Sequence, residues 1–323
     1  KNYPKQLYNI QVTVKKLEKY CVQFESADVG VYAEIHTAEE IQDCSNPYDP
    51  FALHKAALIA CGIIPAQGKA ELEAILKKLG GGIYLSTQVE GVPKGSGLGT
   101  SSILSGACVK GLFSFLGREV EENQVYEVVL AMEQIMSTGG GWQDQIGGLT
   151  DGIKFIVSKP GMDQQIKVEK VEIPEEAKCE LSERFALIYT GQRRLARNLL
   201  RDVVGGYIGS RPDSLEALKE MKPTAALMKF ALEQGNIDEF ARLLDRHWEL
   251  SCQLDAGSTN TCIDQILLVC EGLIDGRFIA GAGGGGFIQV ILKKGVTKRQ
   301  LRDHLHQVFQ DSGVDVWDCE LLI

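Results

Sequence analysis

A glycine-rich turn between a strand pattern and a helix pattern constrains this chain more than any other feature. The turn has the sequence PKGSGLGTSS and covers residues 93–102. Before it, apolar and polar residues alternate over residues 83–90, which predicts a strand. After it, apolar residues recur at helical spacing over residues 101–116, and Gly117 is placed to end that helix. Because glycines let the backbone approach anionic oxygens and a helix N-terminus offers free N–H groups, this order predicts an anion site.

Two better-known phosphate loops do not fit the turn. No lysine stands where the G-x-x-x-x-G-K-[ST] pattern requires one, and Gly95, Gly97 and Gly99 give G-x-G-x-G instead of G-x-G-x-x-G. A serine-capped turn without any ligand is the alternative at this point.

Composition and charge narrow the class of partner. The chain has 323 residues, of which 44% are hydrophobic and 24% charged, values typical of a globular protein with two domains or one large one. A formal net charge of −9 argues against a nucleic-acid backbone as the partner. It does not exclude a nucleotide, which local backbone dipoles and a divalent cation can hold.

Cysteine usage and hydropathy indicate a cytoplasmic protein. The nine cysteines are scattered without a CxxC pair, and the five histidines form no metal-ligand pattern, so reduced thiols are expected. No apolar run approaches 18 residues, and the first residues lack the apolar core of a signal peptide. Neither a membrane nor a nucleic acid is therefore expected as a partner.

Two acidic residues flank a second glycine cluster. Glu133 precedes and Asp144 follows the triple glycine 139–141, and five glycines in ten residues let the chain fold back so that the two carboxylates approach one point. Glu133 lies beside Val129 and Met132 at the edge of an apolar helix face, where a carboxylate needs a partner such as a divalent cation. Asp144 is expected in a loop between two glutamines. A solvated helix acid and a turn aspartate are the respective alternatives.

A third glycine cluster, GAGGGG at residues 281–286, separates two strand patterns. Five glycines in six residues carry a large entropy cost, which argues against a purely structural loop. A tight hairpin with close backbone packing is the alternative.

The remaining patterns predict an α+β protein in two parts. Strands are expected within residues 8–36 and helices over 51–61, 66–79 and 121–136. Residues 192–275 are expected to be mostly helical, with Thr224 after Pro223 starting one helix and residues 237–250 forming another. The last residues alternate between strand and helix. We place the division near residue 177, which gives domains 1–177 and 178–323.

Four segments together resemble a known kinase superfamily. They are VPKGSGLGTSSILSG (92–106), GGGWQDQIGGL (139–149) with GIKF (152–155), YTGQRRLARNLL (189–200) and AGAGGGGF (280–287). The chain resembles the superfamily of galactokinase, homoserine kinase, mevalonate kinase and phosphomevalonate kinase. Within it, Trp142 followed by QDQIGG is similar to the L-fucokinases, including the kinase half of bifunctional fucokinase/GDP-fucose pyrophosphorylases. Heptose phosphate kinases resemble the chain at the first loop and at QDQ.

The resemblance implies a fold and a set of site residues. The fold would be a two-domain small-molecule kinase, with an N-terminal α/β domain that carries the phosphate loop and a C-terminal ferredoxin-like domain with helical insertions. Asp144 matches the catalytic aspartate, and Ser101 and Glu133 match the magnesium ligands. Contacts to the ATP phosphates would come from Pro93, Gly95, Ser96, Gly97, Leu98, Gly99, Thr100, Ser101, Ser102, Gly283 and Gly284. Further substrate or phosphate contacts would come from Gly141, Trp142, Arg193 and Arg194, although a solvated basic helix face that includes Arg197 is the alternative for the arginines.

The implied reaction is the Mg²⁺-dependent transfer of the γ-phosphoryl group of ATP to the anomeric hydroxyl of a free sugar. L-Fucose is the sugar that the resemblance favours. Alternatives are a heptose or other sugar kinase of the superfamily and a non-catalytic nucleotide- or sugar-binding relative. A GDP-fucose pyrophosphorylase domain is a possible fused partner. The family's N-terminal sugar-contacting segment, with its GGWxDTPP-like signature, has no counterpart in this sequence, so we expect either that the sequence is a fragment or that further residues belong before its first strand. A chain that truly lacks the segment is expected to bind ATP without phosphorylating sugar.

Overall fold

The computed structural model describes residues 10–46, 48–93, 95–136, 141–161, 165–192, 197–281, 283–321 and 323, with the backbone alone at 197–202. Residue contacts divide the chain into two compact units. Unit 1 contains residues 1–92 and 99–150, and unit 2 contains residues 93–98 and 151–323. The chain therefore passes between the units three times, after residues 92, 98 and 150, and the second passage lies inside the glycine-rich turn.

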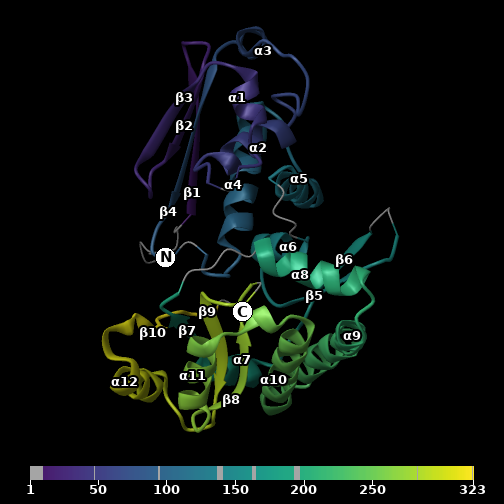
Figure 1. Ribbon diagram of the computed structural model, residues 1–323, viewed down its shortest axis with the longest axis vertical. Helices are drawn as coiled ribbons and strands as arrows, with labels where there is room; N and C mark the ends of the chain where they lie inside the picture. The colour runs from purple at the N-terminus through teal and green to yellow at the C-terminus, as the bar shows by residue number, and fades with distance from the viewer. Residues whose placement is uncertain are drawn as a thin grey trace. The chain divides into compact units, whose positions relative to one another are not determined.

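Unit 1 is a four-stranded sheet with helices against one face (Figure 1). Its strand order is β1-β4-β2-β3, in which β2 and β4 are parallel and the other pairs antiparallel. Alternate residues of the central strands, such as Phe24, Ile83 and Leu85, are fully buried beneath the helices because side chains of a strand alternate between its two faces. The elements of unit 1 are β1 (Ile10–Leu17), β2 (Val22–Ser26), β3 (Val31–Ile35), α1 (Ala38–Gln42), α2 (Ala52–Ala60), α3 (Leu72–Leu79), β4 (Gly82–Val89), α4 (Thr100–Phe115), α5 (Glu122–Ile135) and α6 (Gln143–Leu149).

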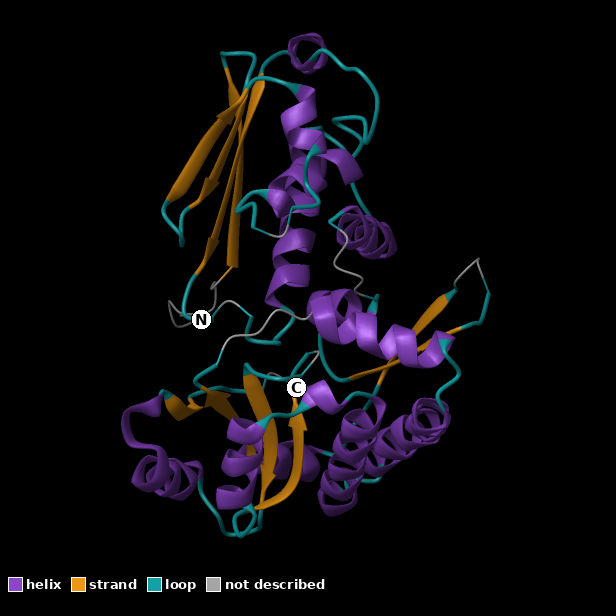
Figure 2. Ribbon diagram, viewed as in Figure 1, coloured by secondary structure: helices purple, strands orange, loops and turns teal. Residues whose placement is uncertain are grey.

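Unit 2 has a ferredoxin-like core. Its elements are β5 (Lys154–Ser158), β6 (Ile166–Lys170), α7 (Glu175–Arg184), β7 (Phe185–Thr190), α8 (Arg197–Ile208), α9 (Pro212–Glu233), α10 (Ile237–Leu254), α11 (Thr261–Cys270), β8 (Ile274–Ile279), β9 (Phe287–Leu292), α12 (Lys298–Phe309) and β10 (Val314–Trp317). Short 3₁₀ turns cover Ala256–Ser258 and Gln310–Ser312. The antiparallel order β10-β7-β9-β8, with α11 and α12 as crossovers, is the βαββαβ arrangement, into which α8, α9 and α10 are inserted after β7 (Figure 2). The expected ferredoxin-like part with helical insertions is thus confirmed.

The central sheet of unit 2 has a hydrophobic core on each face. Ile288, Val290 and Leu292 of β9 pack with α11 and α12, whereas Ile291 packs with residues of α7, α9 and α10. Val171 and Ile173 belong to this second core. Residues 151–177 therefore group with unit 2 by contacts, and the domain limits of 1–177 and 178–323 stay a prediction.

Several helix limits differ from the sequence patterns. Helix α9 begins at Pro212, where a proline is tolerated in the first turn, and continues through Pro223. The prediction that Thr224 starts a helix was therefore wrong. Thr224 is an interior residue of α9, and its hydroxyl donates to the carbonyl oxygen of Glu220 at 2.9 Å. Helix α3 begins only at Leu72, and α10 extends to Leu254.

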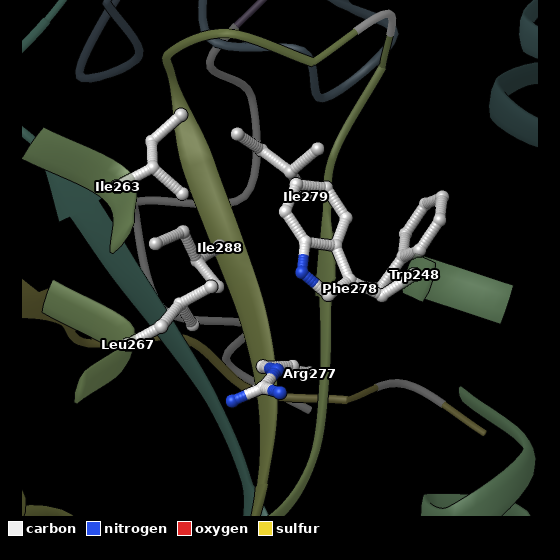
Figure 3. Close-up of a pocket in the computed structure, with 7 residues that line it drawn as sticks. All are labelled: Trp248, Ile263, Leu267, Arg277, Phe278, Ile279 and Ile288. Carbon is white, nitrogen blue, oxygen red and sulfur yellow. The ribbon is translucent and has the colours of Figure 1, made fainter. Parts of the chain in front are cut away.

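A small cavity lies in the core of unit 2, among residues of α10, α11, β8 and β9 (Figure 3). Its lining residues are Trp248, Ile263, Leu267, Arg277, Phe278, Ile279 and Ile288. These residues enclose too little space for a small molecule, whose binding sites typically measure about 300 Å³ or more. This cavity is a gap in core packing and not a substrate pocket. Within the described part of the chain, no helix is long and apolar enough to span a membrane.

Candidate active site

The first half of the glycine-rich turn is held in unit 2 by backbone packing. Gly97 has a left-handed φ of +78°, and a Cβ on it would overlap the carbonyl oxygen of Ala280. A Cβ on Gly281 would in turn lie 2.8 Å from Cα of Gly97. Only glycine at both positions lets the two segments touch, because either side chain would separate the two backbones.

A hydrogen bond joins the same two segments. The N–H of Phe287 donates to the carbonyl oxygen of Ser96 at 3.1 Å, and a Cβ on Gly286 would overlap that same carbonyl. The close backbone packing that the sequence left as the alternative for residues 281–286 is therefore what the structure shows. The packing itself requires glycine at 281 and 286, so the entropy cost has a structural reason at these two positions, and a role of Gly283 and Gly284 in phosphate binding stays a prediction.

The other end of the glycine segment is fixed by the turn before α11. The N–H of Gly284 donates to the carbonyl oxygen of Ser258 at 2.7 Å, and a Cβ on Gly283 would lie 2.8 Å from that oxygen. The side chain of Asn260 reaches the carbonyl oxygen of Gly284 at 3.1 Å. Neither Ser258 nor Asn260 was a candidate from sequence. Because Asn260 directly precedes an apolar helical pattern, the sequence could have predicted it as an N-cap residue. The sequence carried no sign of its contact with the glycine segment.

The second half of the glycine-rich turn opens α4 in unit 1. Gly99 is the N-cap residue of α4, with φ of +68° and no side-chain cap. The first turn of a helix has no helical carbonyls for its N–H groups, so α4 presents its positive end at residues 100–102. Ser101 is exposed there, whereas Ser102 is buried. The oxygen of either hydroxyl can ligate Mg²⁺, and its O–H can donate to a phosphate oxygen.

Glu133 of α5 reaches the first turn of α4. Glu133 is only 8% exposed and lies beside the fully buried Met132 and Val129, as the helix pattern predicted. The hydroxyl of Ser102 donates to Oε1 of Glu133 at 3.5 Å. Of the two adjacent serines, it is thus Ser102 and not Ser101 that contacts the carboxylate. A buried carboxylate with hydroxyl neighbours fits a hard cation such as Mg²⁺.

Asp144 also lies beside the start of α4. It occupies the first turn of α6, so the expected loop position was wrong. A Cβ on Gly99 would lie 3.8 Å from the carbonyl oxygen of Asp144, and one on Gly148 would meet Ile103 at 2.6 Å. Helix α6 therefore packs along the first turns of α4, because Gly148 leaves room for Ile103.

The environment of Asp144 favours its protonated form. Desolvation by the surrounding protein raises the pKa of this carboxyl above its ordinary value, although the residue itself is exposed. A carboxylate of raised pKa is a stronger base than an ordinary aspartate, which is the direction that proton abstraction requires.

The remaining candidates are placed as follows. Gly141 and Trp142 directly precede α6, and the carbonyl oxygen of Trp142 accepts the N–H of Ile146 at 3.1 Å. Arg193 and Arg194 lie outside the described residues, and Arg197 begins α8. Among the residues that the structure describes, no three His, Cys, Asp or Glu side chains form a metal cluster. A magnesium ion would therefore need hydroxyl or ligand oxygens in addition to Glu133.

The match to a family model covers the region just described. Residues 69–152, which include the glycine-rich turn, Glu133 and Asp144, match the model for the GHMP kinases N terminal domain. This part of the chain is a GHMP kinase N-terminal domain. The whole chain is similar to solved structures of galactokinases and mevalonate-type kinases at low identity, which shows that it has the GHMP kinase fold. Lactococcus lactis galactokinase complexed with galactose has a TM-score of 0.66 at 14% identity over 97% of this chain and 85% of that one. Streptococcus pneumoniae phosphomevalonate kinase in complex with phosphomevalonate and AMPPNP has a TM-score of 0.67 at 14% identity, over 96% and 89% of the two chains.

Two curated relatives of this chain are much longer proteins. The chain is 34% identical over 292 residues to the Bacteroides fragilis "L-fucokinase/L-fucose-1-P guanylyltransferase", a match that covers 88% of this chain and 30% of that protein. It is 34% identical over 277 residues to the Arabidopsis thaliana "Bifunctional fucokinase/GDP-fucose pyrophosphorylase", covering 85% and 25%. The Campylobacter jejuni "D-glycero-alpha-D-manno-heptose 7-phosphate kinase" is 28% identical over 200 residues, covering 61% and 58%. The chain thus spans less than a third of the length of the first two relatives.

Proposed function

We propose that this chain is a sugar kinase that transfers the γ-phosphoryl group of ATP to the anomeric hydroxyl of L-fucose. Two relatives at 34% identity carry fucokinase in their names, and the matches cover 85% or more of this chain. Phosphoryl transfer asks little covalent chemistry of a protein, so placement and charge neutralisation have to supply the catalysis.

The observation that carries the proposal is the meeting of two carboxylate-bearing helices at the start of α4. Glu133 contacts Ser102 in the first turn of α4, and the backbone of Asp144 lies against Gly99. The two acidic residues are separated by a glycine cluster in the sequence and yet adjoin the same helix end within unit 1. A structural role alone does not explain why a buried acid and an acid of raised pKa both adjoin a positive helix terminus.

Each residue has a role in the proposed reaction. Asp144 accepts or orients the proton of the attacking sugar hydroxyl, a task that suits its raised pKa. Backbone N–H groups in the first turn of α4 stabilise negative charge on the transferred group. Glu133, together with Ser101, would hold Mg²⁺, which when bound neutralises charge on the phosphate oxygens.

The remaining assignments rest on the resemblance of the sequence motifs. Residues 93–102, with Lys94 excepted, contact the phosphates of ATP, and Gly283 and Gly284 adjoin them. Gly141 and Trp142 contact the substrate, as do Arg193 and Arg194. A kinase that draws on free ATP is expected in the cytoplasm. In a longer protein like the two curated relatives, a fused pyrophosphorylase or guanylyltransferase domain would consume the sugar 1-phosphate.

The test is ADP release with a panel of free sugars and sugar phosphates. We expect turnover with L-fucose that is lost in Asp144→Asn and retained in Asp311→Asn, a matched change at an exposed aspartate of unit 2. Nucleotide binding should survive in both variants. Wild-type protein that binds ATP and phosphorylates none of the sugars would contradict the proposed activity.

A heptose phosphate kinase is the second candidate, favoured by the match to the Campylobacter jejuni enzyme. Turnover with a heptose phosphate and not with L-fucose, in the same panel, would select it. Binding of nucleotide and sugar without turnover in the full-length protein would instead select a non-catalytic relative.

A further inference from the structure

Asn260 uses all four hydrogen-bonding positions of its side-chain amide to join three segments of unit 2. Its Oδ1 accepts the N–H groups of Cys262 and Ile263, at 3.0 and 3.1 Å, and so caps α11. Its Nδ2 donates to the carbonyl oxygen of Gly284 at 3.1 Å and to Oε1 of Gln192 at 3.3 Å. An asparagine amide has two donor hydrogens and two acceptor lone pairs, so this side chain is fully engaged.

The orientation of this amide follows from its partners. Two backbone N–H groups can only donate, so the oxygen must face Cys262 and Ile263. A backbone carbonyl can only accept, so the nitrogen must face Gly284. The side chain cannot be turned over without losing three hydrogen bonds.

A chain of contacts leads from Asn260 to the glycine-rich turn. Asn260 holds Gly284. Two residues further on, the N–H of Gly286 donates to the carbonyl oxygen of Gln192 at 3.0 Å. The next residue, Phe287, donates to the carbonyl oxygen of Ser96. Every member of this chain lies in unit 2.

We infer that Asn260 is a positioning residue that fixes the glycine segment 283–286 and, through it, residues 95–98 for binding of a nucleoside triphosphate. The nucleotide part of this inference rests on the proposed kinase function. A residue that only capped α11 would need the oxygen of the amide and not its nitrogen. Aspartate and serine serve as N-caps about as well as asparagine does, so the two tasks of Asn260 can be separated by mutation.

The chain offers a matched control for these substitutions. Asn236 caps α10, where its Oδ1 accepts the N–H of Glu239 at 3.0 Å. Its side chain makes no described hydrogen bond to the glycine segment. Asn260→Asp and Asn260→Ser are therefore compared with Asn236→Asp and Asn236→Ser. In Asn260→Asp an oxygen would replace the donor and face the carbonyl of Gly284, so two acceptors would oppose each other.

The experiment combines amide hydrogen exchange with nucleotide affinity and steady-state kinetics. We expect both Asn260 variants to speed exchange at the N–H groups of Gly284, Gly286 and Phe287 by about 10-fold or more, and to raise the Kd and KM for ATP by a similar factor. Exchange within α11, the Tm and the KM for sugar should stay near the wild-type values, and both Asn236 variants should match wild type throughout.

Two results would overturn the inference. One is unchanged exchange at Gly284 and Gly286 in both Asn260 variants, which would reduce Asn260 to a helix cap. The other is faster exchange with an unchanged Kd for ATP, which would separate the glycine segment from nucleotide binding. Wild-type protein that binds no nucleotide refutes the proposed function, and with it the nucleotide part of the inference, while exchange still decides whether Asn260 fixes the segment.

Discussion

Two glycine-rich parts of this molecule use glycine for different reasons. In unit 2, Gly97, Gly281 and Gly286 are glycines because another backbone occupies the space of their Cβ atoms. In unit 1, Gly99 and Gly148 lie where α6 packs on the first turn of α4, beside the two acidic residues, Asp144 and Glu133, to which we assign the proposed chemistry. The first part is therefore fixed by main-chain contact, whereas the second is fixed by helix packing and, in the proposed function, depends on two carboxylates.

This difference teaches how each part should respond to mutation. A side chain added at the backbone contact should change structure and function together, because it would overlap the opposing backbone. A carboxylate replaced by its amide changes charge and keeps volume, so function can be lost while the fold persists. The predictions below test that separation.

The largest effect is expected for Gly97→Ala. Its φ of +78° alone costs an alanine about 1–2 kcal/mol of stability, and the overlap with the carbonyl of Ala280 adds roughly 1–3 kcal/mol. Nucleotide binding should be lost along with a clear fall in Tm. The matched control is Gly295→Ala, which has φ of +85° and no atom within 4 Å of its Cβ, so it should show the φ cost alone and normal ATP affinity. Equal losses of Tm in the two variants would remove the backbone-contact explanation.

Asp144→Asn should come next, as a loss of rate without loss of fold. We expect kcat to fall by roughly 10²–10⁴-fold, the range for removal of a general base, with the Kd for ATP and the Tm nearly unchanged. Single-turnover measurements separate the chemical step from binding. A variant that keeps wild-type kcat would take Asp144 out of the proposed mechanism.

A smaller effect is expected for Glu133→Gln, which keeps the side chain's size and its acceptor for Ser102. The Mg²⁺ concentration for half-maximal rate should rise by at least about 10-fold, because a neutral amide holds a hard cation weakly. Glu127→Gln, at an exposed position of the same helix, should leave the magnesium profile unchanged. If Glu127→Gln and Glu133→Gln behave alike, the role of Glu133 in metal binding is refuted.

The smallest expected effect is the pH dependence that Asp144 gives to stability. Its pKa in the folded protein is raised, so between the unfolded and folded pKa values the native state binds the additional proton. Stability then falls as pH rises through that window, and the loss persists above it. Asp144→Asn removes this term, so the variant should equal wild type below the ordinary aspartate pKa and be slightly more stable at neutral pH. Denaturant titrations across pH measure the difference, and a variant less stable than wild type at neutral pH would contradict the sign.

Much of the local structure could be predicted from sequence. The spacing of apolar residues predicted the strand before the turn, the helix that Gly117 ends and the buried edge position of Glu133. This works because side chains return to the same face every 2.0 residues in a strand and every 3.6 residues in a helix. The ferredoxin-like topology of unit 2 was implied by the family resemblance and is confirmed, whereas the pattern of the last residues predicted only an alternation of strand and helix. Patterns failed where a local signal had two meanings, as at Pro223 and Thr224, which suit a helix start and yet lie within α9.

Only the tertiary structure decided how distant segments meet. Sequence could not say that Ser102 contacts Glu133 while Ser101 faces outward, since that depends on how α5 is rotated against α4. Nor could it say that residues 95–97 pack on residues 280–287, because nothing local records which backbone fills the space left by a missing Cβ. A glycine in the sequence shows only that another backbone can approach closely there. Which segment makes the contact is decided when the chain folds.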